Sequence, residues 1–299
     1  MPMNISDYIK LPAGNYVLAV SGGVDSVVLL HLLTRLQKIK LVIAHFDHGI
    51  RHNSSEDTLF VAGLADKHGL KFVTESAELG KDASEETARN FRYDFLFKIA
   101  SDIQADGVIT AHHQDDAIET CFINITRGTG RHGLSSLKNR PGLYRPMLGV
   151  RKNDIINFAK TNKLEWREDQ TNSDTKYLRN NLRLNVIPKM SEVDRNNVIT
   201  IIENSNDINE KVDFILNNML RRGLHKDQPT VSRKWFSKLP AKISNEIIYT
   251  ILKKYKIGEI DNKTVDRIAV QIKTLQAGKK IQFTGGQVIL TKRSARFVS

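Results

Sequence analysis

The sequence contains a single cysteine, Cys121, in 299 residues. One thiol excludes an intramolecular disulfide framework and a zinc site built on several cysteines. Long hydrophobic runs are also missing, because the longest, such as Tyr16 to Val20, fall far short of the roughly 20 residues that a membrane-spanning helix needs. The N-terminus lacks a basic segment followed by an apolar core, as a secretory leader would have. We therefore expect a cytoplasmic protein with no membrane partner.

The loop after the first predicted strand, around Ser21, follows neither of two common nucleotide-binding patterns, G-x-x-x-x-G-K-[ST] and G-x-G-x-x-G. In their place Ser21-Gly22-Gly23-Val24-Asp25-Ser26 joins the apolar run Tyr16–Val20, typical of a buried strand, to Val27–Leu36, which has helical spacing. Adjacent glycines allow a sharp turn, and the free N–H groups of the following helix attract an anion. The loop therefore indicates a phosphate site, although glycines also mark strand-to-helix turns that bind nothing.

Charge is unevenly distributed along the chain. Residues 1–150 hold 16 Lys and Arg against 17 Asp and Glu, whereas residues 151–299 hold 29 against 16, so the net charges are −1 and +13. The length predicts two or more domains. A near-neutral half with a phosphate loop and a strongly basic half together suggest a catalytic domain joined to a nucleic-acid-binding surface. A solvated basic face without a partner is the alternative.

Strand-like and helical patterns alternate over the first 111 residues, which predicts an α/β fold with a parallel, doubly wound sheet. Ligands of such sheets lie beyond the carboxyl ends of the strands. The strand-like runs are Tyr16–Val20, Leu41–His45, Leu70–Thr74 and Gly107–Ala111, and the helical ones between them are Ser26–Leu36, Ser55–His68 and Ser84–Ser101.

Helical patterns dominate after about Val150. We predict helices over Arg151–Thr161 and Asp207–Arg222, the second ending at Gly223, and short strands within Lys280–Val298. A boundary between Leu184 and Asp194 divides the chain into a catalytic domain, 1–190, and a mainly helical basic region with a small terminal β element, 191–299. One side of the second helix carries Ile208, Val212, Ile215, Leu216, Met219 and Leu220.

Polar residues follow the predicted strands. His45 opens HFDHGIR at the end of the second strand, where a nucleotide's base and ribose would lie; a metal site or a loop without a role are the alternatives. Glu86, Arg89 and Arg92 share one flank of a helix. For Glu86 and Arg89 the alternative is an exposed helix face with a salt bridge and no ligand. Arg92 lies among aromatic residues, where an arginine usually has a carboxylate or phosphate partner.

Asp116 and Glu119 follow the fourth strand and share one helix face. Two carboxylates facing one pocket favour a cation, either Mg²⁺ or the ammonium of an amine substrate; a capped helix start is the alternative.

Further arginines lie next to turning backbone, and Arg127 in RGTG and Arg145 in RPML suit a phosphate. The segment EDQTNSDTKYLRNNLR, which includes Arg179 and Arg183, combines a polar loop with a basic, amide-rich helix. Such a composition suits RNA backbone and an unstacked base, while ordinary solvated loops are the alternative.

Together these motifs, in this order from Ser21 to Arg183, resemble the bacterial tRNA(Ile)-lysidine synthetase family of the PP-loop (N-type ATP pyrophosphatase) superfamily; they are SGGVDS, HFDHGIR, EETARNFRYDFL, TAHHQDDAIET, RGTG, RPML and EDQTNSDTKYLRNNLR. The resemblance covers about the first 190 residues and implies a PP-loop ATPase fold of the adenine nucleotide alpha hydrolase-like type. Longer members of the family carry a further C-terminal domain.

The resemblance implies a two-step ligation. ATP adenylylates the C2 oxygen of the wobble cytidine in the CAU anticodon of tRNA(Ile), releasing pyrophosphate, and free lysine then displaces AMP to form lysidine, which changes codon reading from AUG to AUA. By the same resemblance Ser21 to Ser26, His45 and Arg127 bind ATP, with Asp25 placing Mg²⁺. Arg92 meets the lysine carboxylate or the transition-state charge, Asp116 and Glu119 the lysine ammonium groups, and Arg179 and Arg183 the anticodon loop. A homodimer is compatible with this reading.

Two other functions remain open on the residues alone. A tRNA sulfur transferase of the same superfamily needs a persulfide-carrying cysteine or a cluster on several thiolates, which the lone Cys121 serves badly. A non-catalytic RNA-binding protein would explain the basic charge but leaves the carboxylates and arginines at the strand ends without a purpose.

Overall fold

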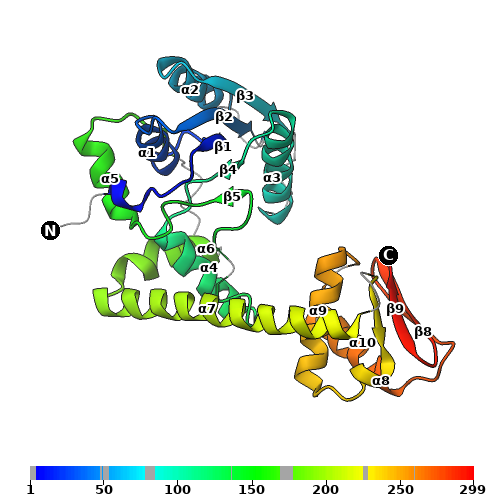
Figure 1. Cartoon of the computed structure of the whole chain (residues 1–299). Coiled ribbons are helices and arrows are strands. Elements are labelled where there is room, and N and C mark those ends of the chain that lie inside the picture. The colour runs from blue at the N-terminus through cyan, green and yellow to red at the C-terminus, as the bar shows by residue number, and fades with distance from the viewer. Residues whose placement is uncertain are drawn as a thin grey trace. The chain divides into compact units, whose positions relative to one another are not determined.

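The computed structural model describes residues 5–47, 49, 54–77, 85–135, 137–168, 178–224, 228–258 and 260–299. The chain forms two compact units, Met1–Asn206 and Asp207–Ser299 (Figure 1).

The first unit is built on a five-stranded parallel sheet with the strand order β3-β2-β1-β4-β5. Its strands are β1 (Gly14–Ala19), β2 (Ile39–Asp47), β3 (Lys71–Ser76), β4 (Gly107–Ile109) and β5 (Leu143–Tyr144). The central strand β1 pairs with β2 and β4, and Tyr16 lies opposite both Leu41 and Gly107. This confirms the predicted parallel α/β sheet. β5 was not predicted, because two residues are too short to show a hydrophobic period.

Helices cover both faces of this sheet (Figure 1). The side chains of β1 alternate, so that Leu18 joins the core on one face and Val17 the core on the other. The first core contains α1 (Val24–Leu33), α2 (Ser54–Lys67) and α5 (Lys152–Thr161), and the second is covered by α3 (Glu85–Asp102). The sheet is therefore buried on both faces, which accounts for its near-continuous apolar strands.

Short helical turns complete the first unit. Helix α4 (Gln114–Thr126) follows β4, and α6 (Leu178–Asn181) continues into a π-helical turn, Leu182–Val186, and a 3-10 turn, Ile187–Lys189. Leu182 and Ile187 pack with Ile118 and Ile123 of α4. This contact places the end of the segment that was predicted to contact RNA against α4, the helix that carries Asp116 and Glu119.

The long helix α7 (Glu192–Gly223) corrects the prediction of a helix beginning at Asp207. It starts 15 residues earlier, where the Ser191 hydroxyl accepts the Asp194 N–H at 3.1 Å, and it ends at Gly223 as predicted. Leu216 and Leu220 are buried, but Ile208 and Ile215, expected on the same side, are each 56% exposed.

The second unit combines helices with an antiparallel sheet of order β6-β9-β8-β7. Its further elements are β6 (Thr230–Ser232), α8 (Arg233–Phe236), α9 (Ala241–Tyr255), α10 (Asn262–Thr274), β7 (Lys280–Phe283), β8 (Gly286–Leu290) and β9 (Ser294–Val298). One core joins Leu216 and Leu220 to α9, α10 and the inner face of the sheet. The predicted small terminal β element and the helical region before it are confirmed, although the individual helices α8 to α10 were not foreseen.

The division into domains 1–190 and 191–299 stays a prediction. The two compact units meet at Asn206 and Asp207, inside α7. Among the described residues, no helix is both long enough and apolar enough to cross a membrane.

Candidate active site

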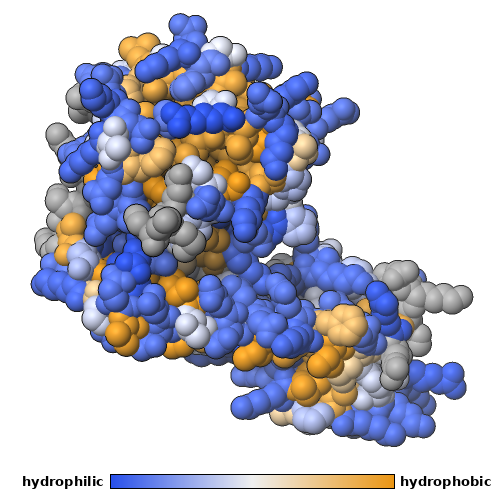
Figure 2. Space-filling model, turned by 60° about the vertical axis from the view of Figure 1, so that its left-hand side comes forward, coloured by the Kyte–Doolittle hydropathy of each residue, from blue (hydrophilic) through white to orange (hydrophobic). Residues whose placement is uncertain are grey.

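A cavity of about 640 Å³ lies in the first unit at the carboxyl ends of the parallel strands. Its size is that of a small-molecule or cofactor site. Small and apolar residues from β1, from β2 and from the segment directly after β4 contribute to its lining, together with charged side chains from α1, α3 and α4. In Figure 2 apolar residues gather in the middle of the larger body, framed by hydrophilic ones.

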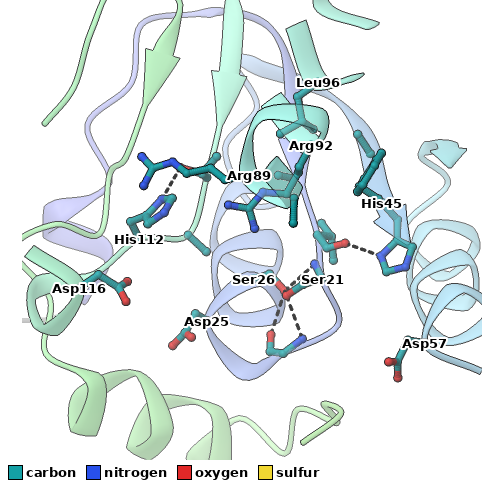
Figure 3. Close-up of a pocket in the computed structure, with 18 of the residues that line it drawn as sticks. Ser21, Asp25, Ser26, His45, Asp57, Arg89, Arg92, Leu96, His112 and Asp116 are labelled. Atoms are coloured by element: carbon teal, nitrogen blue, oxygen red, sulfur yellow. Dashed lines mark hydrogen bonds between the residues drawn. The ribbon is translucent and has the colours of Figure 1, made fainter. Parts of the chain in front are cut away.

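The Ser21–Ser26 loop forms one wall of this cavity (Figure 3). Ser26 Oγ accepts the Ser21 N–H at 3.2 Å and donates to the Gly23 carbonyl at 2.9 Å, while the two hydroxyls lie 3.3 Å apart. Gly22 has φ +88°, a left-handed conformation that favours glycine. Gly23 caps α1 and lines the cavity, and a Cβ there would meet only Ser21 Oγ, at 3.5 Å. A side chain at Gly23 would therefore occupy space that a phosphate needs beside the N–H groups of α1.

Asp25 is paired with a residue that the motifs did not include. Lys152 Nζ lies 2.7 Å from both carboxylate oxygens of Asp25. Asp25 is also 3.7 Å from His113 Nε2, which lies 3.5 Å from Asp116. The predicted metal residue therefore belongs to a chain of charged groups that links α1, α4 and α5.

Two histidines line the cavity at the ends of β2 and β4, the strands on either side of β1. His45 on β2 is buried, and its Nδ1 lies 2.9 Å from the Val20 carbonyl, which ties β2 to the start of the loop. His112 Nδ1 lies 2.8 Å from Thr110 Oγ1. Burial lowers the pKa of His112 to about 3, so its imidazole is neutral near pH 7.

Arg89 and Arg92 extend from α3 into the cavity, with Asp25 and Asp116 on the opposite side in Figure 3. Both guanidinium groups lie 5.6 Å from the centre of the Tyr93 ring. Burial lowers the pKa of Arg92, and no carboxylate pairs with it within the described part of the chain. Two partly buried positive groups beside an aromatic ring are suited to an anion such as a phosphate or a substrate carboxylate.

The two carboxylates of α4 meet the two arginines of the following helical turns. Glu119 is 1% exposed and forms ion pairs with both Arg179 and Arg183, and Arg183 also lies 3.0 Å from Asp116. The four residues were predicted to contact different ligands, lysine and the anticodon loop. In this structure they contact one another, so these predicted contacts would require the arginines to exchange partners.

Burial and charge act in opposite directions on these carboxylates. Burial raises the pKa of Glu119 to about 7, against the lowering effect of Arg183. The pKa of Asp116 is lowered in spite of burial, because His113, His112 and Arg183 surround it and the His113 N–H donates to it at 2.9 Å. Asp116 thus takes part in the capping box of α4, whose N-cap residue is His113, and it also lines the cavity.

Arg145 and Arg127, which were predicted to bind a phosphate, are not among the residues that line the cavity. Arg145 is 1% exposed, donates to the Lys138 carbonyl and to the Tyr93 hydroxyl at 3.2 Å, and thus fastens the chain around β5 to α3. Arg127 is an exposed residue at the C-terminal cap of α4, about 16 Å along the helix from Asp116. Its assignment to ATP stays a prediction. His48 and most of the loop after Glu168, residues 169–177, lie outside the described residues.

A PP-loop domain model matches residues 4–190 of this sequence. The chain belongs to the PP-loop domain family. The match contains the Ser21–Ser26 loop, all five strands of the parallel sheet and the residues of the cavity.

Curated relatives of this PP-loop chain are called tRNA(Ile)-lysidine synthase. The protein of Thermosipho africanus is 41% identical over 200 residues, which cover 63% of this chain and 47% of the relative. That of Bacteroides thetaiotaomicron is 34% identical over 212 residues, covering 68% and 50%. The resemblance inferred from the motifs is thereby confirmed, and the aligned part spans about half the length of these relatives.

A solved structure has the same fold. The U34-tRNA thiolase NcsA from Methanococcus maripaludis, determined with its 4Fe-4S cluster, superposes with a TM-score of 0.53 at 13% identity, covering 69% of this chain and 77% of the thiolase. At this identity the similarity concerns the fold alone.

Sequence reasoning missed Lys152, His113 and Arg195 in this PP-loop site. Arg195, at the start of α7, donates to Asp115 at 2.7 Å, and the Lys152 N–H points to the same carboxylate at 3.5 Å. Lys152 lies 127 residues from Asp25 in the chain, so no local motif could join them. A basic residue at the start of a helix that follows the last strand was the only available signal.

The donors present fit a magnesium ion of the kind that the family implies. Mg²⁺ is commonly bound by one or two carboxylates together with substrate phosphates and water rather than by an all-protein cage. Asp25 and Asp116 supply two such carboxylates on one cavity, joined through His113. Within the described ranges, no cluster of three or more His, Cys, Asp or Glu forms a complete cage.

Proposed function

We propose that this chain modifies tRNA(Ile) by ligating free lysine to the wobble cytidine of the CAU anticodon, using ATP. The observation that carries this proposal is the site itself, where the Ser21–Ser26 loop, an arginine pair and a carboxylate pair share one cavity. The names of the relatives agree with it. In this proposal the reaction has two steps, adenylylation of the cytidine and attack by lysine.

In the first step the Ser21–Ser26 loop and the N-terminus of α1 bind the phosphates of ATP. The N–H groups beyond Gly23 and the two serine hydroxyls donate hydrogen bonds to phosphate oxygens. Asp25, together with Asp116, would hold Mg²⁺, which neutralises phosphate charge when bound. His45 fixes the end of β2 where the nucleoside lies. The cytidine O2 attacks the α-phosphorus, and pyrophosphate leaves with the electron pair of the broken bond.

In the second step the ε-amine of lysine attacks C2 and AMP leaves. A free lysine amine has a pKa of about 10.4, so it must lose a proton before it attacks. Glu119 is suited to take part, because burial raises its pKa to about 7. Arg92, on the opposite wall, would bind the carboxylate of lysine or the charge that develops on the adenylate. Arg179 and Arg183 would exchange Glu119 and Asp116 for the anticodon phosphates.

The sulfur-transfer alternative is disfavoured by the position of Cys121. This residue, the only cysteine of the sequence, is 2% exposed on α4, and burial raises the pKa of its thiol. A sulfur carrier needs an accessible thiolate. A buried, protonated thiol does not meet that need.

Mass spectrometry of nucleosides tests the proposal. CAU-anticodon tRNA is incubated with the protein, ATP and isotopically labelled lysine, then digested. We expect lysidine carrying the label, formed only when both ATP and lysine are present. Unmodified cytidine under these conditions, or a thiolated nucleoside when a sulfur donor replaces lysine, would contradict it.

A further inference from the structure

Lys152 forms an ion pair with Asp25, the carboxylate of the phosphate loop. Its ammonium lies 2.7 Å from each oxygen of Asp25, and both side chains are partly exposed, 33% for Lys152 and 27% for Asp25. A partly exposed ion pair contributes little to the stability of a fold. The pair is therefore poorly explained as a structural support, and its location at the loop calls for another role.

The backbone holds Lys152 at this place. Lys152 is the first residue of α5, which packs against α1, and Ile155 and Ala159 of α5 are fully buried in the shared core. Its N–H points to Asp115 at 3.5 Å, and Asp115 is in turn bound by Arg195. The ammonium is thus delivered to the start of α1 by a rigid element, while the side chain itself keeps its freedom to move.

A cation at the loop would offset the negative charge of bound phosphates. The Ser21–Ser26 loop contributes hydroxyls and one carboxylate, and it has no lysine of its own. Arg167 and Arg183 also line the cavity, but they pair with carboxylates outside the loop: Arg167 with Glu56 and Asp57, and Arg183 with Glu119 and Asp116. Lys152 instead pairs with the loop itself. A lysine acts as a compact point charge for phosphate, with three donors that can reorient.

We infer that Lys152 is a phosphate-binding residue that contacts the β- and γ-phosphates of the nucleotide and stabilises pyrophosphate as it leaves. This inference rests on the proposed use of ATP. When the bond between the α-phosphorus and the bridging oxygen breaks, the electron pair stays on pyrophosphate. The ammonium of Lys152 donates hydrogen bonds to those oxygens and takes no part in a proton transfer. The same ammonium, shared between Asp25 and the phosphates, sets the distance between them.

The test compares ATP with AMP, which lacks the two phosphates that Lys152 is inferred to contact. Isothermal titration calorimetry of the full chain with Mg²⁺ measures both affinities for wild type and K152M. We expect K152M to bind ATP about 10- to 100-fold more weakly, as the loss of a charge-assisted hydrogen bond implies, and AMP within about twofold of wild type. K152R, which keeps the charge, should retain most of the preference for ATP.

Lys160 provides a matched control, because it lies on the same helix and is exposed. K160M should change neither affinity. Equal weakening of ATP and AMP by K152M, or unchanged ATP binding, would overturn the inference; if K152M does not fold, K152Q replaces it under the same criteria. The titrations contain neither tRNA nor lysine, so a failure of lysidine formation leaves their outcome intact and the two ideas are separately testable.

Discussion

The two compact units differ in how their charges are used. Residues 1–206 contain 26 Lys and Arg against 25 Asp and Glu, whereas residues 207–299 contain 19 against 8, so the net charge of +12 is divided as +1 and +11. The boundary after Asn206 therefore also separates a near-neutral unit from a strongly basic one. The net charge of the whole chain hides this difference.

Several cations of the first unit form ion pairs with carboxylates in or near the cavity. Lys152 pairs with a carboxylate of α1, and Arg183 and Arg195 pair with carboxylates of α4. In the second unit, Lys253 and Lys254 are exposed and lie over tyrosine rings, 5.6 and 5.3 Å from the ring centres. Internal pairing fixes geometry, and an excess of exposed positive charge attracts a polyanion. This contrast supports catalysis in the first unit and RNA binding by the second.

The largest effect is expected from Asp25→Asn. The amide keeps the shape but not the charge, which pairs with Lys152 and in the proposed mechanism would hold Mg²⁺. Metal-assisted stabilisation is worth several kcal/mol, so tRNA-dependent pyrophosphate release should fall about 10³-fold or more. tRNA affinity should stay near that of wild type, since the basic unit is unchanged. Normal pyrophosphate release by this variant would contradict the assignment of Asp25 to the active site.

A smaller effect should follow from Glu119→Gln. If Glu119 binds the lysine ammonium, the KM for lysine should rise about tenfold while that for ATP stays constant, because the binding of one substrate is weakened. Steady-state kinetics with each substrate varied in turn provides the two values.

Thermal unfolding is the control for this variant, because Glu119 also pairs with Arg179 and Arg183 in a buried position. Removing one partner of a buried ion pair is destabilising. A lower Tm with unchanged KM for lysine would make Glu119 a structural residue. Equal increases in both KM values would move it to the magnesium site.

The smallest effect concerns pH and His112. Its pKa is about 3 in the folded protein and about 6.5 when unfolded, so below pH 6.5 the unfolded chain takes up a proton that the folded one does not. The free energy of unfolding should therefore fall with decreasing pH, by about 1 kcal/mol from pH 7 to 5.5 through this group alone. Urea unfolding of His112→Asn should show a decrease smaller by that amount; identical pH dependence would contradict the burial of a neutral imidazole.

The sequence predicted the parallel sheet well because each strand is buried on both faces and its apolar run is continuous. The Ser21–Ser26 loop was equally clear, since its glycines, strand and helix are adjacent. Prediction failed where the signal was short or distant. β5 has two residues, and α7 begins with a polar first turn whose start is set by Ser191.

For the site residues as well, neighbours in the sequence were predicted and contacts between distant segments were not. Asp116 and Glu119 were found because they are neighbours on one helix face. Their partners Arg179 and Arg183 were found too, but the contact between the pairs is tertiary and was not foreseen. Arg145 was assigned to a phosphate although its guanidinium is buried against Tyr93. A motif thus identifies a charged group, and only packing decides what that group contacts.

The salt dependence of binding tests the division of labour between the units most directly. Filter-binding titrations measure the affinity for CAU-anticodon tRNA between 50 and 200 mM salt, with ATP affinity measured under the same conditions. If the second unit neutralises about five phosphates, tRNA affinity should fall about 100-fold over this range, while ATP binding in the near-neutral unit changes little. A flat response for tRNA would mean that the +11 of residues 207–299 is a solvated surface, and would contradict RNA binding by the second unit.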